Sequence, residues 1–236
     1  IELCLVGSEM CIRDSIHSIR SQFPNARADT VLGIGDDGAQ VLAQGALSLV
    51  TDTLVEGVHF FPNAAPEDLG WKSLAVNLSD LAAMGASPAW ALLNLTLPAA
   101  SQSFVQSFMN GFAELARRYD VDLIGGDTTR GPLSITVTAL GHAAASPLRR
   151  GTAQVGDLIV HSGHVGDAAW AYRSLYQQCV PDTYFLARLN RPEPRVRLGR
   201  ILVGNATSAM DISDGLYADL HHLLGLSALH MSCLLY

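Results

Sequence analysis

Residues 121–139, VDLIGGDTTRGPLSITVTA, carry the pattern that decides the fold class. The apolar run at residues 121–124 predicts a short buried strand that leads into a glycine-rich segment containing Asp127. From Leu133 to Ala139, apolar side chains alternate with hydroxyl side chains, which is the period of a strand with one buried face. The stretch therefore predicts two strands and, between them, an acid among glycines.

The chain before this stretch alternates between helix and strand patterns. Residues 66–84 are predicted to form a helix, because a proline and two acids open the segment and a glycine follows it. Residues 104–119 show apolar side chains every three or four positions, which predicts a second helix with one buried face. Apolar runs predict strands at residues 47–51, with Asp52 at the strand's end, and at residues 89–97.

The second half of the chain shows weaker patterns of the same kinds. We predict, in order, a strand at residues 158–161, a glycine-rich turn, a helix at residues 167–178, a passage rich in proline and arginine at residues 188–200, and a final helix from residue 216. Because strands alternate with helices, the fold class is α/β or α+β. A polar, arginine-containing region at residues 147–156 is where we expect the domain boundary.

Composition excludes several classes of protein. The 236 residues are 49% hydrophobic and 16% charged, which is enough apolar material for a folded core. A net charge of −7 argues against partnership with nucleic acid or with an anionic membrane surface. Lys72 is the single lysine and does not follow a glycine, so no phosphate-binding loop of the G-x-x-x-x-G-K-[ST] type exists, and bound phosphates would need metal ions and arginines.

Four cysteines without a C-x-x-C pair indicate reduced thiols and a cytoplasmic location. No run of 18 apolar residues predicts a membrane span. Residues 1–15, IELCLVGSEMCIRDS, show no period and no cap, and we interpret them as a non-native leader; residues 232–236 raise the same suspicion.

Seven aspartates share a setting, because most of them follow an apolar run and have glycine, serine or threonine beside them: Asp36, Asp37, Asp52, Asp80, Asp127, Asp211 and Asp214. Oxygen ligands of this kind suit Mg²⁺, and a metal-bridged polyphosphate is the ligand that would need so many of them. The alternative is that each acid only makes local hydrogen bonds in a surface turn.

Five segments together resemble the thiamine-monophosphate kinase family, which belongs to the aminoimidazole ribonucleotide synthetase-like superfamily. They are GIGDDGA (residues 33–39), TDTLVEGVHF (51–60), WKSLAVNLSDLAAMGASPAW (71–90), LIGGDTTRGPLSIT (123–136) and DISDGLYADL (211–220). The resemblance implies an N-terminal mixed-sheet domain with flanking helices at residues 16–147, which binds ATP and Mg²⁺. Residues 148–236 would then be the start of a second α/β domain, incomplete because the family continues beyond the last motif.

The resemblance also implies an activity and a set of site residues. The family transfers the γ-phosphate of ATP to thiamine monophosphate, with several Mg²⁺ ions, as a homodimer. Matched position by position, the metal ligands are Asp37, Thr51, Asp52, Asp80, Asp127, Asp211 and Asp214, with Asp36 less certain than its neighbour. The nucleotide-contacting positions are Gly126, Asp127, Arg150 and Ser213, with Arg130 a lesser candidate, and His59 contacts the substrate.

Phosphate chemistry agrees with these roles, because direct transfer between two phosphates needs alignment and charge neutralisation and no side-chain base. Three other readings stay open. One is a sister ATP-dependent synthetase of the same superfamily, and another is an inactive truncated fragment that only binds nucleotide. The last is a metal-dependent phosphatase built on Asp52, which usually wants a second acid two positions later, where this chain has Leu54.

Overall fold

The computed structural model describes residues 19, 22–23, 27–99 and 101–229. Its described residues belong to two compact units, which we treat separately: Ile1–Leu78 with Pro88–His142, and Ser79–Ser87 with Ala143–Tyr236. The predicted leader, the last five residues and three of the cysteines (Cys4, Cys11 and Cys233) lie outside the described residues.

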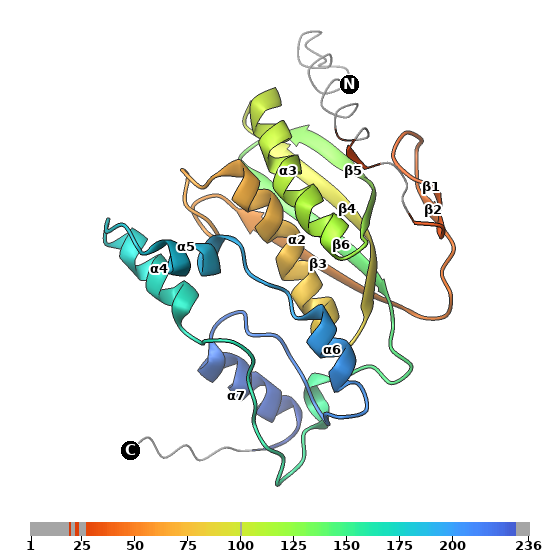
Figure 1. Cartoon of the computed structure of the whole chain (residues 1–236), viewed down its shortest axis with the longest axis vertical. Helices are drawn as coiled ribbons and strands as arrows, with labels where there is room; N and C mark the ends of the chain where they lie inside the picture. The colour runs from red at the N-terminus through yellow and green to blue at the C-terminus, as the bar shows by residue number, and fades with distance from the viewer. Residues whose placement is uncertain (1–18, 20–21, 24–26, 100, 230–236) are drawn as a thin grey trace. The chain divides into compact units, whose positions relative to one another are not determined.

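A four-stranded mixed sheet in the order β3-β6-β4-β5 forms the first unit (Figure 1). Its strands are β3 (Leu47–Val55), β4 (Ser87–Leu97), β5 (Asp122–Arg130) and β6 (Ser134–His142). Strand β3 runs antiparallel to β6, and β4 runs parallel to β5. A short antiparallel pair, β1 (Thr30–Leu32) with β2 (Gln40–Val41), precedes the sheet.

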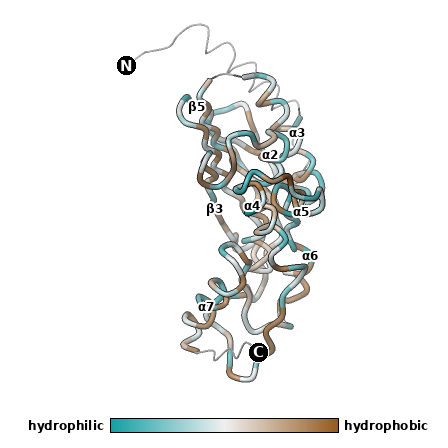
Figure 2. Tube along the Cα trace, turned by 90° about the vertical axis from the view of Figure 1, so that its left-hand side faces the viewer, coloured by the Kyte–Doolittle hydropathy of each residue, from teal (hydrophilic) through white to brown (hydrophobic). Residues whose placement is uncertain are grey.

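Two helices, α2 (Pro66–Ala83) and α3 (Gln102–Arg118), cover one face of this sheet, as the two views agree (Figures 1 and 2). The alternation predicted for β6 is confirmed, because Ile135, Val137 and Ala139 are fully buried and the residues between them are half-exposed. Both helices confirm their predictions to within two residues at each end. The α/β fold class is therefore confirmed.

Two glycines set the distance between α2 and α3. A Cβ atom on Gly70 would overlap the backbone carbonyl of Phe108, and one on Gly111 would overlap the backbone carbonyl of Glu67. Backbone therefore packs directly on backbone, which brings the aromatic side chains of α3 into the core beneath the sheet. Ser101 caps α3 by accepting a hydrogen bond from the Phe104 N–H group.

The second unit contains a 3₁₀ turn, η1 (Arg150–Thr152), and four helices. These are α4 (Asp167–Tyr176), α5 (Thr183–Asn190), α6 (Val196–Leu202) and α7 (Leu216–Leu226). Helix α4 packs on α5, and α7 packs on η1. The last turn of α2 belongs to this unit, where Gly199 of α6 lies against the Ala82 carbonyl. Helices α4 and α7 confirm their predictions.

The strand predicted at residues 158–161 is wrong. These residues are irregular, and the side chains of Leu158 and Val160 are 90% and 85% exposed. An apolar run becomes a strand only when a neighbouring strand pairs with it, and none of the described residues does so here.

Other predicted boundaries also need correction. Strand β3 continues past Asp52 to Val55, and β5 continues through the glycine-rich segment to Arg130, because β6 and β4 pair with them over those residues. Asp52 and Asp127 therefore lie within strands and not in turns after them. The passage at residues 188–200 contains the end of α5 and most of α6, which its prolines and arginines concealed. No helix in the described part of the chain is long and apolar enough to cross a membrane.

The glycine contact between α2 and α3 gives a stability prediction. We expect Gly111→Ala to lower the free energy of unfolding by about 1–3 kcal/mol, because the new methyl group overpacks a backbone contact. Urea unfolding followed by far-ultraviolet circular dichroism measures it. Gly225→Ala is the matched control: nothing lies within 4 Å of the added atom in α7, so this variant should gain about 0.5–1 kcal/mol. A Gly111→Ala variant as stable as the control would contradict the packing described.

Candidate active site

The segment between β1 and β2, residues 33–38, carries the adjacent acids Asp36 and Asp37. Asp36 Oδ1 accepts a hydrogen bond of 2.9 Å from the Asp37 N–H group, so the first carboxylate stabilises the turn. Gly35 has a φ of 131°, a backbone conformation that favours glycine. The Asp37 side chain is exposed, and no bond to its carboxylate is found within the described residues.

Thr51 and Asp52 are neighbours on β3, and they point to opposite faces of the sheet. The Thr51 hydroxyl donates to the Val137 carbonyl at 3.2 Å and lies 3.0 Å from the Thr138 hydroxyl, on the face that α2 and α3 leave open. Asp52 lies opposite Val137 and shares its face of the sheet. The side chains of Thr51 and Asp52 are therefore not placed to hold one ion together.

Gly126 and Asp127 lie on β5, where β5 comes very close to β4. Gly126 has a φ of 142°, and a Cβ atom there would overlap the backbone of Leu93, so only glycine fits. Asp127 is exposed and its Oδ1 accepts from the Thr128 N–H group at 2.8 Å. Two strands, β6 and β4, separate β5 from β3, so Asp127 and Asp52 do not lie on neighbouring strands.

Three of the predicted residues meet in the second unit. The Arg150 Nη2 atom lies 3.7 Å from Asp211 Oδ1, and Asp80 shares a hydrogen bond with the Asp211 side chain. Burial raises the pKa of Asp211, an effect that the nearby Arg150 guanidinium opposes. The backbone carbonyl of Arg150 accepts hydrogen bonds from the hydroxyls of Ser208 at 2.9 Å and Ser227 at 3.2 Å, which fix the η1 turn.

Ser213 and Asp214 are held by a residue that sequence reasoning missed. The buried carboxylate of Asp219 accepts hydrogen bonds from the N–H groups of Ser213, Asp214 and Gly215, at 2.8, 3.0 and 3.1 Å. Both candidate side chains, Ser213 and Asp214, remain exposed. An acid in the first turn of a helix that follows Ser-Asp-Gly was the available signal, because such an acid reaches back to the free N–H groups before the helix.

His59 lies in the loop after β3 and is exposed. Its Nδ1 atom accepts a hydrogen bond of 3.0 Å from the Val55 N–H group, so a neutral ring carries its proton on Nε2, which is left to donate. Its backbone carbonyl lies 3.4 Å from the Lys72 amino group, whose pKa is lowered by burial. The loop therefore orients the ring and leaves one donor available.

The candidate ligand side chains are of the type that Mg²⁺ requires. All candidate side chains offer oxygen atoms, which Mg²⁺ prefers, and Asp37, Asp127 and Asp214 are exposed. Across the described ranges, however, no group of three or more His, Cys, Asp or Glu side chains gathers as a ready cage. This arrangement fits an ion that keeps several waters and is held by one or two carboxylates together with substrate phosphates.

Comparison with known proteins first defines the class. A family model described as AIR synthase related protein, N-terminal domain, matches residues 35–143. The crystal structure of thiamine-monophosphate kinase from Stenotrophomonas maltophilia K279a superposes with a TM-score of 0.84 at 46% identity, over 94% of this chain and 72% of that one. Hydrogenase maturation protein HypE superposes at 0.71 with 21% identity and shares the fold alone. The fold is thus that of the AIR synthase-related proteins.

Sequence relatives narrow the class to one family. Thiamine-monophosphate kinase of Escherichia coli K12 is 46% identical over 208 residues, which are 85% of this chain and 64% of that protein. The Bacillus subtilis enzyme is 37% identical over 224 residues, 89% of this chain and 69% of that protein. The chain belongs to the thiamine-monophosphate kinase family. It spans 64% of the length of its Escherichia coli relative.

The raised pKa of Asp211 gives a prediction with a definite sign. The folded chain binds this proton more tightly than the unfolded chain, so the free energy of unfolding falls as pH rises between the unfolded and folded pKa values. Asp211→Asn removes this effect. We expect the stability of Asp211→Asn relative to the wild type to improve as pH rises above about 3.9, where an unfolded aspartate ionises and the folded Asp211 still holds its proton.

Urea titrations at each pH measure this difference. Asp214→Asn, three residues further on and exposed, serves as the control for removing one negative charge. A relative stability of Asp211→Asn that fell with rising pH would show that Arg150, and not burial, dominates the environment of Asp211.

Proposed function

We propose that this chain, completed to the length of its relatives, transfers the γ-phosphate of ATP to thiamine monophosphate and forms thiamine diphosphate. One observation carries the proposal. A family member whose structure is described as AaThiL complexed with AMPPCP and TMP superposes on 96% of this chain with a TM-score of 0.73 at 30% identity. AMPPCP is an ATP analogue, so both substrates of the proposed reaction bind to a fold of this kind.

Oxygen atoms of seven side chains would hold Mg²⁺ between protein and phosphates. For this role we propose Asp37, Thr51, Asp52, Asp80, Asp127, Asp211 and Asp214. When bound, Mg²⁺ neutralises the phosphate charge and polarises the transferred group. The chain's own contribution is to orient donor and acceptor in line and to exclude competing geometries.

The remaining groups contact the nucleotide or the acceptor. The backbone of Gly126 and the exposed hydroxyl of Ser213 would contact the nucleotide. The Arg150 guanidinium would supply a positive charge. Two serine hydroxyls hold the backbone carbonyl of the same residue. The Nε2 donor of His59 would bind an anionic acceptor. No general base is assigned, because a phosphate acceptor needs none.

Other readings receive less support. A phosphatase built on Asp52 would need a partner acid at position 54, but Leu54 stands there and is buried. A sister synthetase that relies on an N-terminal cysteine would use Cys4 or Cys11, which lie outside the described residues. A fragment that binds nucleotide without turnover remains the main rival, because this chain spans 64% of its Escherichia coli relative.

The open face of the sheet supports a homodimer. Thr51, Thr53, Thr136 and Thr138 form two hydroxyl pairs across β3 and β6 on this face, and Leu49 lies beside them with 61% of its surface exposed. A sheet face with an exposed leucine next to neutral hydroxyls suits a second copy of the same sheet, since neither partner introduces charge. We propose a dimer through this face.

We also propose the division into an N-terminal domain at residues 16–147 and an incomplete second domain at residues 148–236.

A cytoplasmic location is proposed as well. The one cysteine among the described residues, Cys179, is free and exposed, which suits a reducing compartment.

Asp37 gives the sharpest test of the proposed chemistry. In the chain completed to full length, we expect Asp37→Asn to lower Mg²⁺-dependent ADP release in the presence of thiamine monophosphate by about a hundredfold or more, because one metal ligand loses its charge. Glu114→Gln, an exposed acid of α3, is the matched control and should retain activity. Full activity in Asp37→Asn would remove residues 33–38 from the site.

The dimer proposal has its own test. We expect Leu49→Glu to produce monomers in light scattering, because two glutamates would be buried face to face without partners. Val180→Glu introduces the same charge at a position that is 94% exposed in the second unit, and it should leave the dimer intact. A wild-type chain that scatters only as a monomer would refute the proposed interface.

A further inference from the structure

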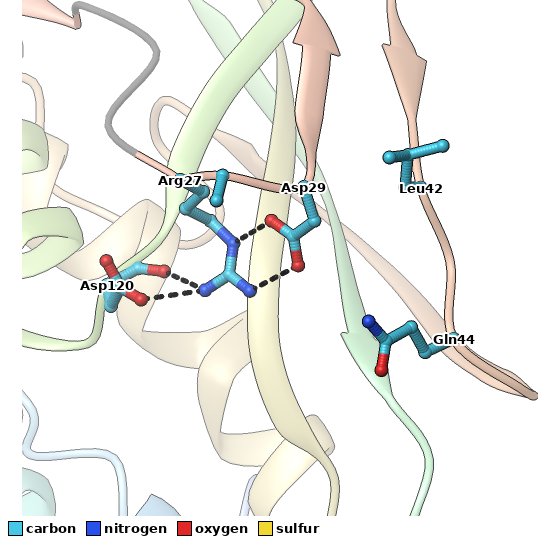
Figure 3. Close-up of a pocket in the computed structure, with 6 residues that line it drawn as sticks. Arg27, Asp29, Leu42, Gln44 and Asp120 are labelled. Atoms are coloured by element: carbon cyan, nitrogen blue, oxygen red, sulfur yellow. Dashed lines mark hydrogen bonds and ion pairs between the residues drawn. The ribbon is translucent and has the colours of Figure 1, made fainter.

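A network of polar side chains joins the β1–β2 pair to the sheet, and none of its members has a role in the site described so far. Figure 3 shows Arg27 between two carboxylates. Its Nε and Nη2 atoms donate to the two oxygens of Asp29 at 2.8 and 2.7 Å, and its Nη1 atom donates to the carboxylate and carbonyl oxygens of Asp120, both at 2.9 Å. The bond from Arg27 holds the pKa of Asp29 below its usual value.

The inner part of this network is buried. The Trp90 Nε1 atom donates to the Thr30 hydroxyl at 3.0 Å, and that hydroxyl donates to Asp122 Oδ2 at 2.7 Å. The Arg27 N–H group donates to the same oxygen at 3.2 Å. Thr30, Trp90 and Asp122 are each less than 9% exposed. The threonine hydroxyl therefore acts as both acceptor and donor where water cannot replace it.

The Thr30–Asp122 bond connects two of the three segments that carry proposed metal ligands in the first unit. Thr30 is the first residue of β1, which leads directly into residues 33–38 with Asp37. Asp122 is the first residue of β5, whose continuation carries Gly126 and Asp127. A single buried hydrogen bond thus ties together the starting points of both segments.

The β1–β2 pair is held partly by packing, because Val41 lies against the buried cluster of Ala89, Trp90 and Ile124. Its strands have three and two residues, and an isolated two-stranded pair of that length is not stable in water. Its base is closed by the Leu42 N–H group, which donates to the Asp29 carbonyl at 2.8 Å. Asp29 in turn lies 3.3 Å from the His142 ring, at the end of β6. Side-chain bonds at the base of the pair therefore add to this packing in fixing where its turn lies.

We propose that Thr30 and Asp122 are positioning residues, which fix residues 33–38 relative to β5 so that Asp37 and Asp127 engage one Mg²⁺–nucleotide complex. They do so without touching the ligand. The inference rests on the proposed function, because it gives Asp37 and Asp127 a common ligand, and it adds a requirement that the family resemblance does not supply.

The test compares three variants of this chain. Thr30→Val keeps the shape of the side chain and removes the hydroxyl, Thr30→Ser restores a hydroxyl, and Asp120→Asn changes a carboxylate of the same network whose side chain is 78% exposed. Amide hydrogen exchange of residues 33–38 reports the position of the turn. Calorimetry with AMPPCP and MgCl₂ reports ligand binding, and the chemical shift of the Trp90 indole proton reports the bond itself.

We expect Thr30→Val to shift the Trp90 indole signal, to raise exchange in residues 33–38 by about tenfold, and to weaken Mg²⁺-dependent AMPPCP binding by about tenfold, as the loss of a buried hydrogen-bond partner predicts. Thr30→Ser should return all three values to within about twofold of the wild type, and Asp120→Asn should stay close to the wild type, because its bonds are exposed to water.

Each other outcome is decisive. Thr30→Val with a shifted indole signal but unchanged affinity would overturn the positioning role and leave the proposed function intact. Unchanged exchange in residues 33–38 would overturn it as well. If Thr30→Val does not fold, Asp122→Asn replaces it under the same criteria. If the wild-type chain does not bind AMPPCP in the presence of Mg²⁺, the role of Thr30 toward a common ligand fails in this chain, while exchange still shows whether Thr30 holds the turn and phosphate transfer by the completed chain tests the proposed function separately.

Discussion

Mutual repulsion among carboxylates is the constraint on which the arrangement of this chain depends. Acids cannot crowd together in a folded protein unless a cation or a donor offsets their charge. The candidate ligands are accordingly spread over a turn, two strands, a helix and the segment before α7. Two of them, Asp80 and Asp211, share a hydrogen bond, and the Arg150 guanidinium lies beside Asp211. This spacing is consistent with the proposal that the cations are bound together with a phosphate ligand.

Two kinds of aspartate follow from the same constraint. Asp122 and Asp219 are 6% and 3% exposed, and each accepts two or more hydrogen bonds from nearby donors, so these acids stabilise turns and strand ends. Asp37 and Asp127 are exposed. The buried acids hold the backbone on which the exposed ones are presented. The aspartates that stabilise the fold and those proposed as ligands are therefore different residues.

Much of the fold could be predicted from the sequence, because α3 and β6 have strong periodicity, α2 has clear start and stop signals, and β4 is a long apolar run. The strand at residues 158–161 could not be judged, since an apolar run does not reveal whether a partner strand exists. The length of β5 was also hidden, because Gly126 reads as a turn residue unless the backbone of Leu93 is known to lie against it.

The candidate site, like the fold, could be predicted from the sequence only in part. The sequence motifs identified the candidate aspartates. Sequence spacing could not show that Thr51 and Asp52 face opposite sides of β3, or that β6 and β4 separate β3 from β5. Asp219 and the Thr30–Asp122 pair were missed for a related reason. Thr30 and Asp122 are 92 positions apart in the sequence, and such a contact leaves no local pattern, whereas the signal for Asp219 was only its place in the first turn of α7.

The most direct test follows the fate of the γ-phosphate. The chain completed to full length is incubated with γ-labelled ATP and thiamine monophosphate, with and without Mg²⁺, and the labelled products are separated. The account predicts that the label appears in thiamine diphosphate, and only when Mg²⁺ is present. Label released as inorganic phosphate, or transferred equally well without Mg²⁺, would contradict it.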